Sequence, residues 1–360
     1  MRKAILVLGM HRSGTSAVAG VMAQLGIAAP LTLMPATSDN ERGYWESLRL
    51  AALHDELLAS AGGKWDDWRA FDREWHSSAS ADHFKARAKP LLEEEFGKAD
   101  LFVFKDPRIC RILPFWTTVL EEMQIAPLVV IPIRSPLEVA RSLAKRDGFS
   151  LEKGLLIWLR HVLDAERETR HLPRAIVAMD DLFEDWRGAM TKIGRLLEIE
   201  WPAFDETIAV AIDNFISRDL RHQTAPTDGL PAMFAWTIKA YDAMLALRDQ
   251  PRSRLALGVL DEVSATFELA CAFMGPAFAE IEAKVAHVGG EAASLRSQRD
   301  ELSRKCDGLA ALLNQRKPSR NGLDKPVLEE RLINLAANRE RAQRRLQSIQ
   351  VTLAAAATQI

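Results

Sequence analysis

The segment 5–22, ILVLGMHRSGTSAVAGVM, joins an apolar run to a helix-like apolar pattern through a short polar loop. Gly9 and Gly14 bound this loop, and the hydroxyl residue Ser16 follows it. In a strand–loop–helix turn of this kind, backbone N–H groups and the helix N-terminus can surround an anion. The segment therefore predicts an α/β fold that begins with an anion-binding loop, rather than a glycine turn that serves packing alone.

The charges around this loop differ from those of a magnesium-dependent nucleoside triphosphate site. Thr15 stands where such a loop carries the lysine that reaches the β- and γ-phosphates, and Arg12 supplies a positive charge from within the loop. A triphosphatase also needs an aspartate at a strand end to hold Mg²⁺, whereas two later apolar runs end in Lys105 and Arg134. This pattern favours an anionic nucleotide bound by side chains, with no metal.

Apolar runs alternate with helical patterns along most of the chain. The predicted strands are 4–9, 99–107 (ending at Lys105), 126–136 and 174–182, and the predicted helices are 14–26, 47–62 and 150–170. Strands that are apolar along their whole length and separated by helices are typical of a parallel β-sheet flanked by helices. Because ligands bind at the carboxyl ends of such strands, the loop after Gly9, Lys105 and Arg134 are expected to converge.

After about residue 275 the chain changes to apolar residues that recur every seven positions. One such tract covers 281–313 and a second covers 328–360, with a proline- and glycine-containing break at 317–326. Sustained heptads of this length predict a C-terminal helical coiled-coil extension. Arg299, Cys306 and Arg339 occupy positions of this repeat, the apolar seam of the coiled coil, and weaken it.

The change of pattern divides the chain into a domain at 1–278 and a coiled-coil tail at 279–360. A helix with an apolar seam does not remain unpaired in water. The two tracts therefore pack on each other in one chain, or they pair with another copy of the chain as a homo-oligomer or with a partner protein. All candidate site residues precede residue 225, so the site is expected not to depend on the tail.

Composition excludes several classes of protein. A formal net charge of −2 argues against a dedicated nucleic-acid binder. No run approaches the ~18 apolar residues of a membrane span. The N-terminal apolar run is too short for a signal peptide, and His11-Arg12 follows it where the small residues of a cleavage site would be needed. The three cysteines are widely spaced, as is usual in a reducing compartment. We therefore expect a cytoplasmic protein.

Three motifs together resemble the sulfotransferases that use 3′-phosphoadenosine 5′-phosphosulfate. HRSGTS (11–16) resembles their 5′-phosphosulfate-binding loop, and IRSPLEVARSL (133–143) resembles their 3′-phosphate-binding segment. FKDPR (104–108) resembles the central lysine motif in the form seen in tyrosylprotein and heparan sulfotransferases. The resemblance covers roughly 1–225 and implies the P-loop-like sulfotransferase fold.

Further segments narrow this resemblance to a bacterial branch. GMHRSGTS, DNERGYWE and KDPRICRILPFW together look like bacterial sulfotransferase family proteins. The segment 173–199 resembles the later strand–helix unit of the family, although Met179 stands where an aromatic residue is more usual.

The resemblance implies a binding site for the donor nucleotide. Its 5′-phosphosulfate would be held by the loop residues His11, Arg12, Ser13, Gly14, Thr15 and Ser16. Arg134 and Ser142, a strand-end arginine and a helix serine eight residues later, would grip the 3′-phosphate. Arg221, in the basic segment 215–223, either closes over the same phosphate or belongs to a surface cluster.

Sulfuryl transfer is an in-line displacement in which the acceptor oxygen attacks sulfur as the phosphate leaves. Arg12 and Lys105 are the candidates to stabilise the charge that develops on the leaving phosphate. The acceptor hydroxyl needs a base. Cytosolic sulfotransferases carry a histidine two residues after the motif lysine, where this chain has Pro107, so the resemblance points to a glutamate.

Two glutamates are candidates for this base. Glu46 follows two aromatic residues, an apolar neighbourhood that can raise a carboxyl pKa toward a useful value. Glu41 lies nearer the position that the glutamate-base enzymes suggest. His11 is a further candidate, and either glutamate could instead form an ordinary salt bridge or helix cap.

The acceptor is expected to be a hydroxylated molecule, either a carbohydrate such as a glycan or a small metabolite, and nothing in the sequence distinguishes among sugars, lipids and phenols. Two other functions remain open. The chain could be a P-loop nucleotide kinase, or a non-catalytic nucleotide-fold scaffold that works through its coiled coil.

WDDW (65–68) is interpreted as a packed loop rather than a metal site, and His161 as a core or capping histidine.

Overall fold

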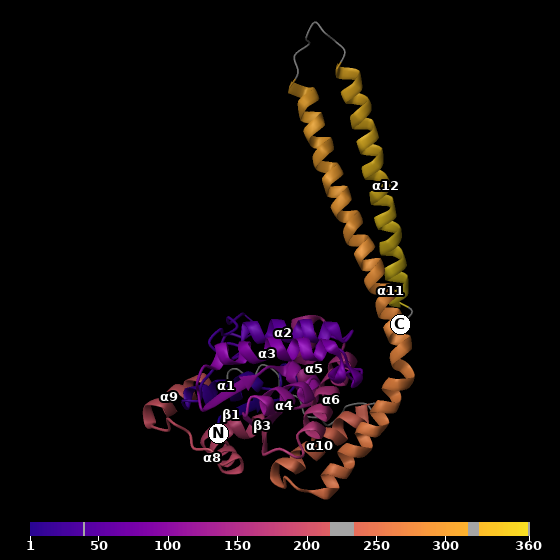
Figure 1. Ribbon diagram of the computed structural model, residues 1–360. Coiled ribbons are helices and arrows are strands. Elements are labelled where there is room, and N and C mark those ends of the chain that lie inside the picture. The colour runs from indigo at the N-terminus through magenta and orange to yellow at the C-terminus, as the bar shows by residue number, and fades with distance from the viewer. Residues whose placement is uncertain (39, 217–233, 316–323, 359–360) are drawn as a thin grey trace. The chain divides into compact units, whose positions relative to one another are not determined.

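The structure is a computed structural model that describes residues 1–38, 40–216, 234–315 and 324–358 (Figure 1). Contacts along the chain separate it into two units, Met1–Cys271 and Ala272–Ile360. Each unit has buried apolar residues of its own. Within the described residues, no helix combines the length and the apolar character needed to cross a membrane.

A four-stranded parallel sheet forms the centre of the first unit. Its strands lie in the order β2 (Leu101–Lys105), β1 (Lys3–Val7), β3 (Ala126–Ile133) and β4 (Arg174–Ala178). The register sets Val7 opposite both Lys105 and Val130. The last residue of β2 therefore lies beside the end of β1, where the polar loop begins. The predicted parallel sheet is confirmed.

Helices cover both faces of this sheet (Figure 1). Alternate residues of β1 point to opposite faces, so that Leu6 joins one buried cluster and Val7 the other. The first cluster is completed by α2 (Leu48–Ser60), α3 (Ala79–Phe96), α4 (Leu113–Glu122), α5 (Pro136–Asp147), α6 (Leu151–Glu168) and α10 (Ala235–Asp249). The second is completed by α1 (Thr15–Gln24), α7 (Met179–Glu184), α8 (Trp186–Leu197) and α9 (Glu206–Phe215).

The ends of several helices follow from local sequence. Pro136 occupies the first turn of α5, where its missing N–H costs nothing, and Gly148 ends this helix with a φ of 70°. Ser150 begins α6 by accepting a hydrogen bond from the Lys153 backbone N–H. Two short 3₁₀ helices, η1 (Glu74–Ser77) and η2 (Pro107–Arg111), complete the connections.

The predicted strand 174–182 is wrong in its second half. Pairing with β3 ends at Ala178, opposite Ile133, and Met179–Glu184 is the helix α7. Among the described residues no strand neighbours β4 beyond Ala178, since β3 ends at Ile133. Asp180 and Asp181 then lie in the first turn of α7, where negative charge favours a helix.

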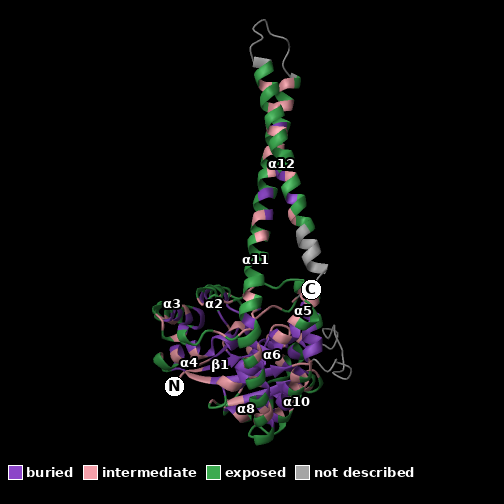
Figure 2. Cartoon of the chain, turned by 90° about the vertical axis from the view of Figure 1, so that its right-hand side faces the viewer, coloured by how far each residue is buried: buried purple, intermediate pink, exposed green. Residues whose placement is uncertain are grey.

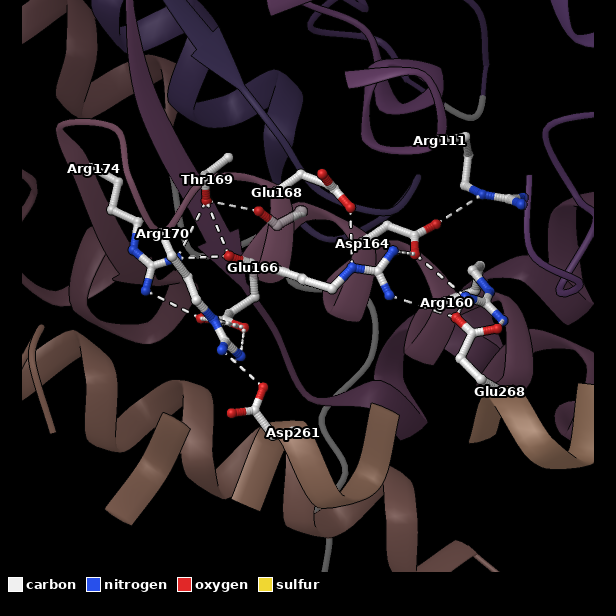
Figure 3. A network of polar contacts seen from close by, with 12 residues as sticks. Arg111, Arg160, Asp164, Glu166, Glu168, Thr169, Arg170, Arg174, Asp261 and Glu268 are labelled. Atoms are coloured by element: carbon white, nitrogen blue, oxygen red, sulfur yellow. Dashed lines mark hydrogen bonds and ion pairs between the residues drawn. The ribbon is translucent and has the colours of Figure 1, made fainter. Parts of the chain in front are cut away.

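Charged residues connect the N-terminal part of α11 (Arg254–Gln315) to α6 and to the turn that follows α6 (Figure 3). The buried Arg160 donates to Glu268 Oε1 at 2.6 Å, and Arg170 pairs with Asp261 at 2.7 Å. Apolar residues of the same stretch of α11, among them Leu260 and Phe267, belong to the first buried cluster. This part of α11 is therefore a structural element of the first unit.

In the second unit, α11 continues and packs antiparallel against α12 (Asp324–Thr358), as Figure 1 shows. Ala292, Leu295 and Leu346, all at predicted seam positions, form its buried cluster. Both helices are otherwise mostly exposed (Figure 2). Arg345 pairs with Glu291 across the two helices. The two heptad tracts thus pack within one chain, while their pairing between chains stays a prediction.

We expect a chain that ends after residue 278 to keep the fold of the first unit, because the sheet, its covering helices and the anchors on α11 are retained. A chain that ends after residue 253 is the matched control. It loses the buried side chains Leu260, Val263 and Phe267 and should unfold at a clearly lower temperature. Circular dichroism measures both midpoints. An unfolded 1–278 chain would show that the domain boundary is wrong.

The full chain and the 1–278 chain together test association through the tail. If α11 or α12 pairs with another copy of the chain, light scattering should give a larger assembly for the full chain than for the 1–278 chain. Equal numbers of subunits in both would contradict pairing through the tail.

Candidate active site

The loop between β1 and α1 has the backbone of an anion-binding turn. Arg12 and Gly14 have φ values of 70° and 89°, in the left-handed region, and the Ser13 N–H donates to the Met10 carbonyl. Such alternation can turn successive N–H groups toward one side. A Cβ at Gly14 would lie 2.1 Å from the Met179 sulfur, and a side chain would also be strained at this positive φ, so glycine is favoured here. A left-handed arginine costs about 1–2 kcal/mol, a strain typical of functional loops.

A pocket of about 230 Å³ opens beside this loop. Most of its polar lining comes from the loop, the segment 38–46 and the two strand ends at Lys105 and Arg134. Its basic residues are Arg12, Arg42, Lys105, Arg134 and Arg146, its acidic residues are Glu41 and Glu46, and its apolar wall includes Met179, Phe183, Phe215 and Ile216. The pocket thus combines an excess of positive charge with an apolar side.

Lys105 is buried at the floor of the site. Its Nζ donates to Ser16 Oγ at 3.1 Å and to the Tyr44 carbonyl at 3.0 Å, and it forms an ion pair with Glu46. The side chains of Lys105 and Glu46 are each 2% exposed. A strand end, the first turn of α1 and the segment before α2 therefore meet at one ammonium group.

The residues expected to hold a 3′-phosphate lie against the loop. Arg12 Nε donates to Ser142 Oγ on α5 at 2.8 Å. Arg134 Nη1 donates to the Arg12 carbonyl at 3.3 Å, and its Nε pairs with Glu138 at 2.7 Å. Arg134 and Ser142 thus both contact Arg12, and their role toward a 3′-phosphate stays a prediction. Arg221 lies outside the described residues.

The two glutamates differ in their surroundings. Burial raises the pKa of Glu46, the nearby charge of Asp106 adds to this, and Lys105 and Arg108 oppose it. Glu41 lines the same pocket but is exposed. The structure therefore brings both glutamates to one pocket, and the choice between them as base stays a prediction.

His11 lines the pocket with a neutral ring. Burial lowers its pKa well below the usual value, and the charges of Arg108 and Arg146 lower it further. Its ring meets Trp65 edge-on with centroids 4.5 Å apart. Its Nε2 is buried without a hydrogen-bond partner in the described part of the chain.

Behind Lys105 lies a buried polar group that the sequence reasoning missed. Asp106 accepts from His54 Nδ1 at 2.8 Å and from the Arg108 backbone and side chain at 2.8 and 3.1 Å. Burial alone would raise the pKa of Asp106, but Arg108 and His54 outweigh it and hold this pKa well below the usual range. FKDPR contained Asp106 and Arg108, but no sequence signal linked them to His54.

The interpretations of WDDW and His161 agree with the structure. Asp66 pairs with Lys153 at 2.6 Å and Asp67 with Arg69 at 2.7 Å, so WDDW is a packed loop. His161 is buried with its Nδ1 2.9 Å from the Ile157 carbonyl, as in a core histidine. Among the described residues, no group of three or more His, Cys, Asp or Glu could hold a metal ion.

No protein-family model and no curated protein sequence matches this chain. Among solved structures, a sulfotransferase domain from the Synechococcus PCC 7002 olefin synthase aligns with a TM-score of 0.38 and 17% identity, over 67% of this chain and 94% of that one. A sulfotransferase domain from the curacin biosynthetic pathway aligns with a TM-score of 0.33 and 16% identity, over 65% and 82%. Residue roles therefore rest on this chain's own geometry.

Asp106→Asn should lower the free energy of unfolding by about 3 kcal/mol at pH 7, because it removes one partner of a buried charged group. Since the folded protein holds the pKa of Asp106 below its ordinary value of 3.8, the stabilisation is complete above that pH. It is lost as the pH falls toward the lowered pKa. Urea unfolding at pH 7 and pH 3 should therefore show a smaller difference between the two proteins at pH 3.

Asp82→Asn is the control for this measurement. Asp82 pairs with Lys85 on the surface of α3 and its side chain is 75% exposed, so its loss should change stability little. Equal effects of the two substitutions at pH 7 would contradict the claim that the buried Asp106 carboxylate stabilises the folded protein.

Proposed function

We propose that the protein is a sulfotransferase that moves a sulfuryl group from 3′-phosphoadenosine 5′-phosphosulfate to a hydroxyl group of a carbohydrate or small-metabolite acceptor. The observation that carries this proposal is the convergence of the loop, Lys105 and Arg134 on one pocket, with Ser142 bonded to the loop residue Arg12. These groups come from three strand ends and the helices after them, as the motif resemblance requires.

The donor would bind as an anion with an apolar end. Loop N–H groups and the hydroxyls of Thr15 and Ser16 would hold the 5′-phosphate, with Arg12 beside it. Arg134 and Ser142 would exchange part of their present bonds, to Glu138 and Arg12, for the 3′-phosphate. The adenine would lie against the apolar wall. The excess of basic over acidic residues in the pocket matches such a ligand.

The chemistry follows from the position of Lys105. The acceptor oxygen attacks sulfur while the bond from sulfur to the phosphate oxygen breaks, and the leaving 3′,5′-bisphosphate takes the electron pair. The Lys105 ammonium and Arg12 would neutralise that charge. The acceptor proton passes to a base, for which Glu46 is the first candidate and Glu41 the second. The raised pKa of Glu46 brings it nearer the range of an effective base.

Two binding measurements and one transfer assay test the function. The protein should bind adenosine 3′,5′-bisphosphate without metal more tightly than ATP with Mg²⁺; the reverse order would favour a nucleotide kinase. Radiolabelled sulfuryl transfer to hydroxylated acceptors, screened from glycan extracts to small phenols, should then give labelled product. Nucleotide binding without transfer to any acceptor would favour the non-catalytic scaffold.

The cellular compartment of the enzyme and its assembly through the tail are also part of the proposal. Cys110, Cys271 and Cys306 are buried free thiols, which suits the reducing cytoplasm. The tail would add a homo-oligomer contact or a partner protein without contributing to the pocket.

Arg134→Ala should weaken binding of 3′-phosphoadenosine 5′-phosphosulfate by about 2 kcal/mol or more, the contribution of a hydrogen bond to a charged group. Affinity for adenosine 5′-phosphosulfate, which lacks the 3′-phosphate, should hardly change. Calorimetric titration with both nucleotides measures the difference. An equal loss for both would overturn the assignment of Arg134 to the 3′-phosphate.

Lys105→Ala should lower kcat by at least ~10²-fold with a smaller effect on donor Kd, because the ammonium is expected to act mainly on the leaving phosphate. Lys89→Ala, on α3 and paired with Glu122, is the surface control and should keep full activity. Single-turnover kinetics separates the two parameters. Loss of donor binding with kcat retained would make Lys105 a ground-state anchor.

A further inference from the structure

The Glu46 carboxylate lies between two cations. One of its oxygens pairs with Lys105 Nζ, and the other, Oε2, lies 3.6 Å from Arg108 Nη1. Lys105 lines the pocket, whereas Arg108 is not among the described residues that line it. Arg108 therefore approaches Glu46 from η2, behind the site, with a side chain that is 11% exposed.

Arg108 is itself held by several bonds. Its Nε donates to Asp55 Oδ1 at 2.6 Å, and its backbone N–H and Nη1 both donate to Asp106 Oδ1. Asp106 Oδ2 in turn faces His54 Nδ1 at 2.8 Å. Two acidic side chains thus fix the guanidinium, one from α2 and one from the end of β2.

The proton on His54 can be assigned from its other neighbour. Trp116 Nε1 lies 2.9 Å from His54 Nε2, and an indole N–H can only donate. His54 Nε2 is therefore the acceptor, and the proton on Nδ1 points at Asp106. The Asp106 carboxylate thus accepts from His54 on its core side and from Arg108 on the side of the site, and this buried series of hydrogen bonds links the core to Arg108.

We propose that Arg108 is a positioning residue of the active site, which holds the Glu46 carboxylate from behind so that Lys105 can turn to the leaving phosphate. This inference rests on the proposed function. Without a second cation, movement of Lys105 would leave a buried carboxylate unpaired, which is costly. Glu46 would then either keep its ion pair with Lys105, which could not turn to the phosphate, or take up a proton. With Arg108 in place, Glu46 stays ionised and ready to accept the acceptor proton.

The charged groups that face Glu46 predict the direction in which its pKa should change when Arg108 is replaced. Burial and Asp106 raise the pKa of Glu46, and Lys105 and Arg108 lower it. Removal of the Arg108 charge should therefore raise this pKa. The acidic limb of the pH dependence of kcat/KM should move to higher pH by the same amount.

The first experiment needs no substrate. Arg108→Met should raise the Glu46 pKa by about one pH unit or more, as expected for the loss of an opposite charge at this distance. Carbon-13 carboxyl NMR measures it, with the signal assigned from Glu46→Gln. Arg108→Lys should restore most of the wild-type value. Arg108→Gln keeps hydrogen-bond donors but removes the charge. It should raise the Glu46 pKa in the same way and replaces Arg108→Met if that variant does not fold.

The control is Arg87→Met, which removes an arginine that pairs with Glu56 between α3 and α2. It should leave the Glu46 pKa unchanged. An unmoved Glu46 pKa in folded Arg108→Met or Arg108→Gln would overturn the role of Arg108.

The second experiment separates this inference from the proposed function. In Arg108→Gln the acidic limb of kcat/KM should move upward while donor Kd changes less than threefold. A shifted Glu46 pKa together with no sulfuryl transfer by the wild-type protein would overturn the proposed function and leave the Arg108–Glu46 pairing standing. Sulfuryl transfer with an unmoved acidic limb in Arg108→Gln would overturn the inference alone.

Discussion

The buried ion pair between Lys105 and Glu46 ties together parts of the chain that are far apart in sequence. A buried ion pair is favourable only where further hydrogen bonds satisfy its donors and acceptors. Lys105 has these in Ser16 Oγ and the Tyr44 carbonyl, while Arg108 faces the second oxygen of Glu46. The pair thereby fixes the segment before α2 against the end of β2 and the start of α1. The pocket takes its shape from this arrangement.

The sheet order makes this pairing possible. β2 and β3 lie on either side of β1, so Lys105 and Arg134 lie at the ends of the strands that flank β1 and its loop. A different strand order would move one of these cations away from the loop. Because the strands are short and buried on both faces, their positions are set by packing of two separate cores. The fold itself therefore brings these cations to the loop.

Helix α11 belongs to two different packing arrangements. Leu260 and Phe267 are buried with the sheet and its helices, whereas Ala292 and Leu295 are buried against α12. Between them the helix needs no break, since an apolar stripe can change partners along one helix. The first stretch is held by Arg160 and Arg170, so one continuous helix serves both the first unit and the tail.

The sequence by itself determined the features that depend on neighbouring residues. The glycines and hydroxyls around Arg12 predicted the anion-binding turn, apolar runs predicted the parallel sheet, and a heptad repeat predicted the two long helices. Each is set by local backbone preference and by the burial pattern of a single element. The error at Met179 arose because strand pairing ends where the neighbouring strand ends, which no local pattern reveals.

Only the tertiary structure decided which polar groups meet. Arg12 bonds to Ser142, 130 residues later, and His54 bonds to Asp106, 52 residues later. The sequence placed Glu46 and Lys105 in one site but gave no sign that they pair, or that Arg108 stands behind them. Such contacts are selected by burial, because a charged group removed from water must find a partner wherever the packed core provides one.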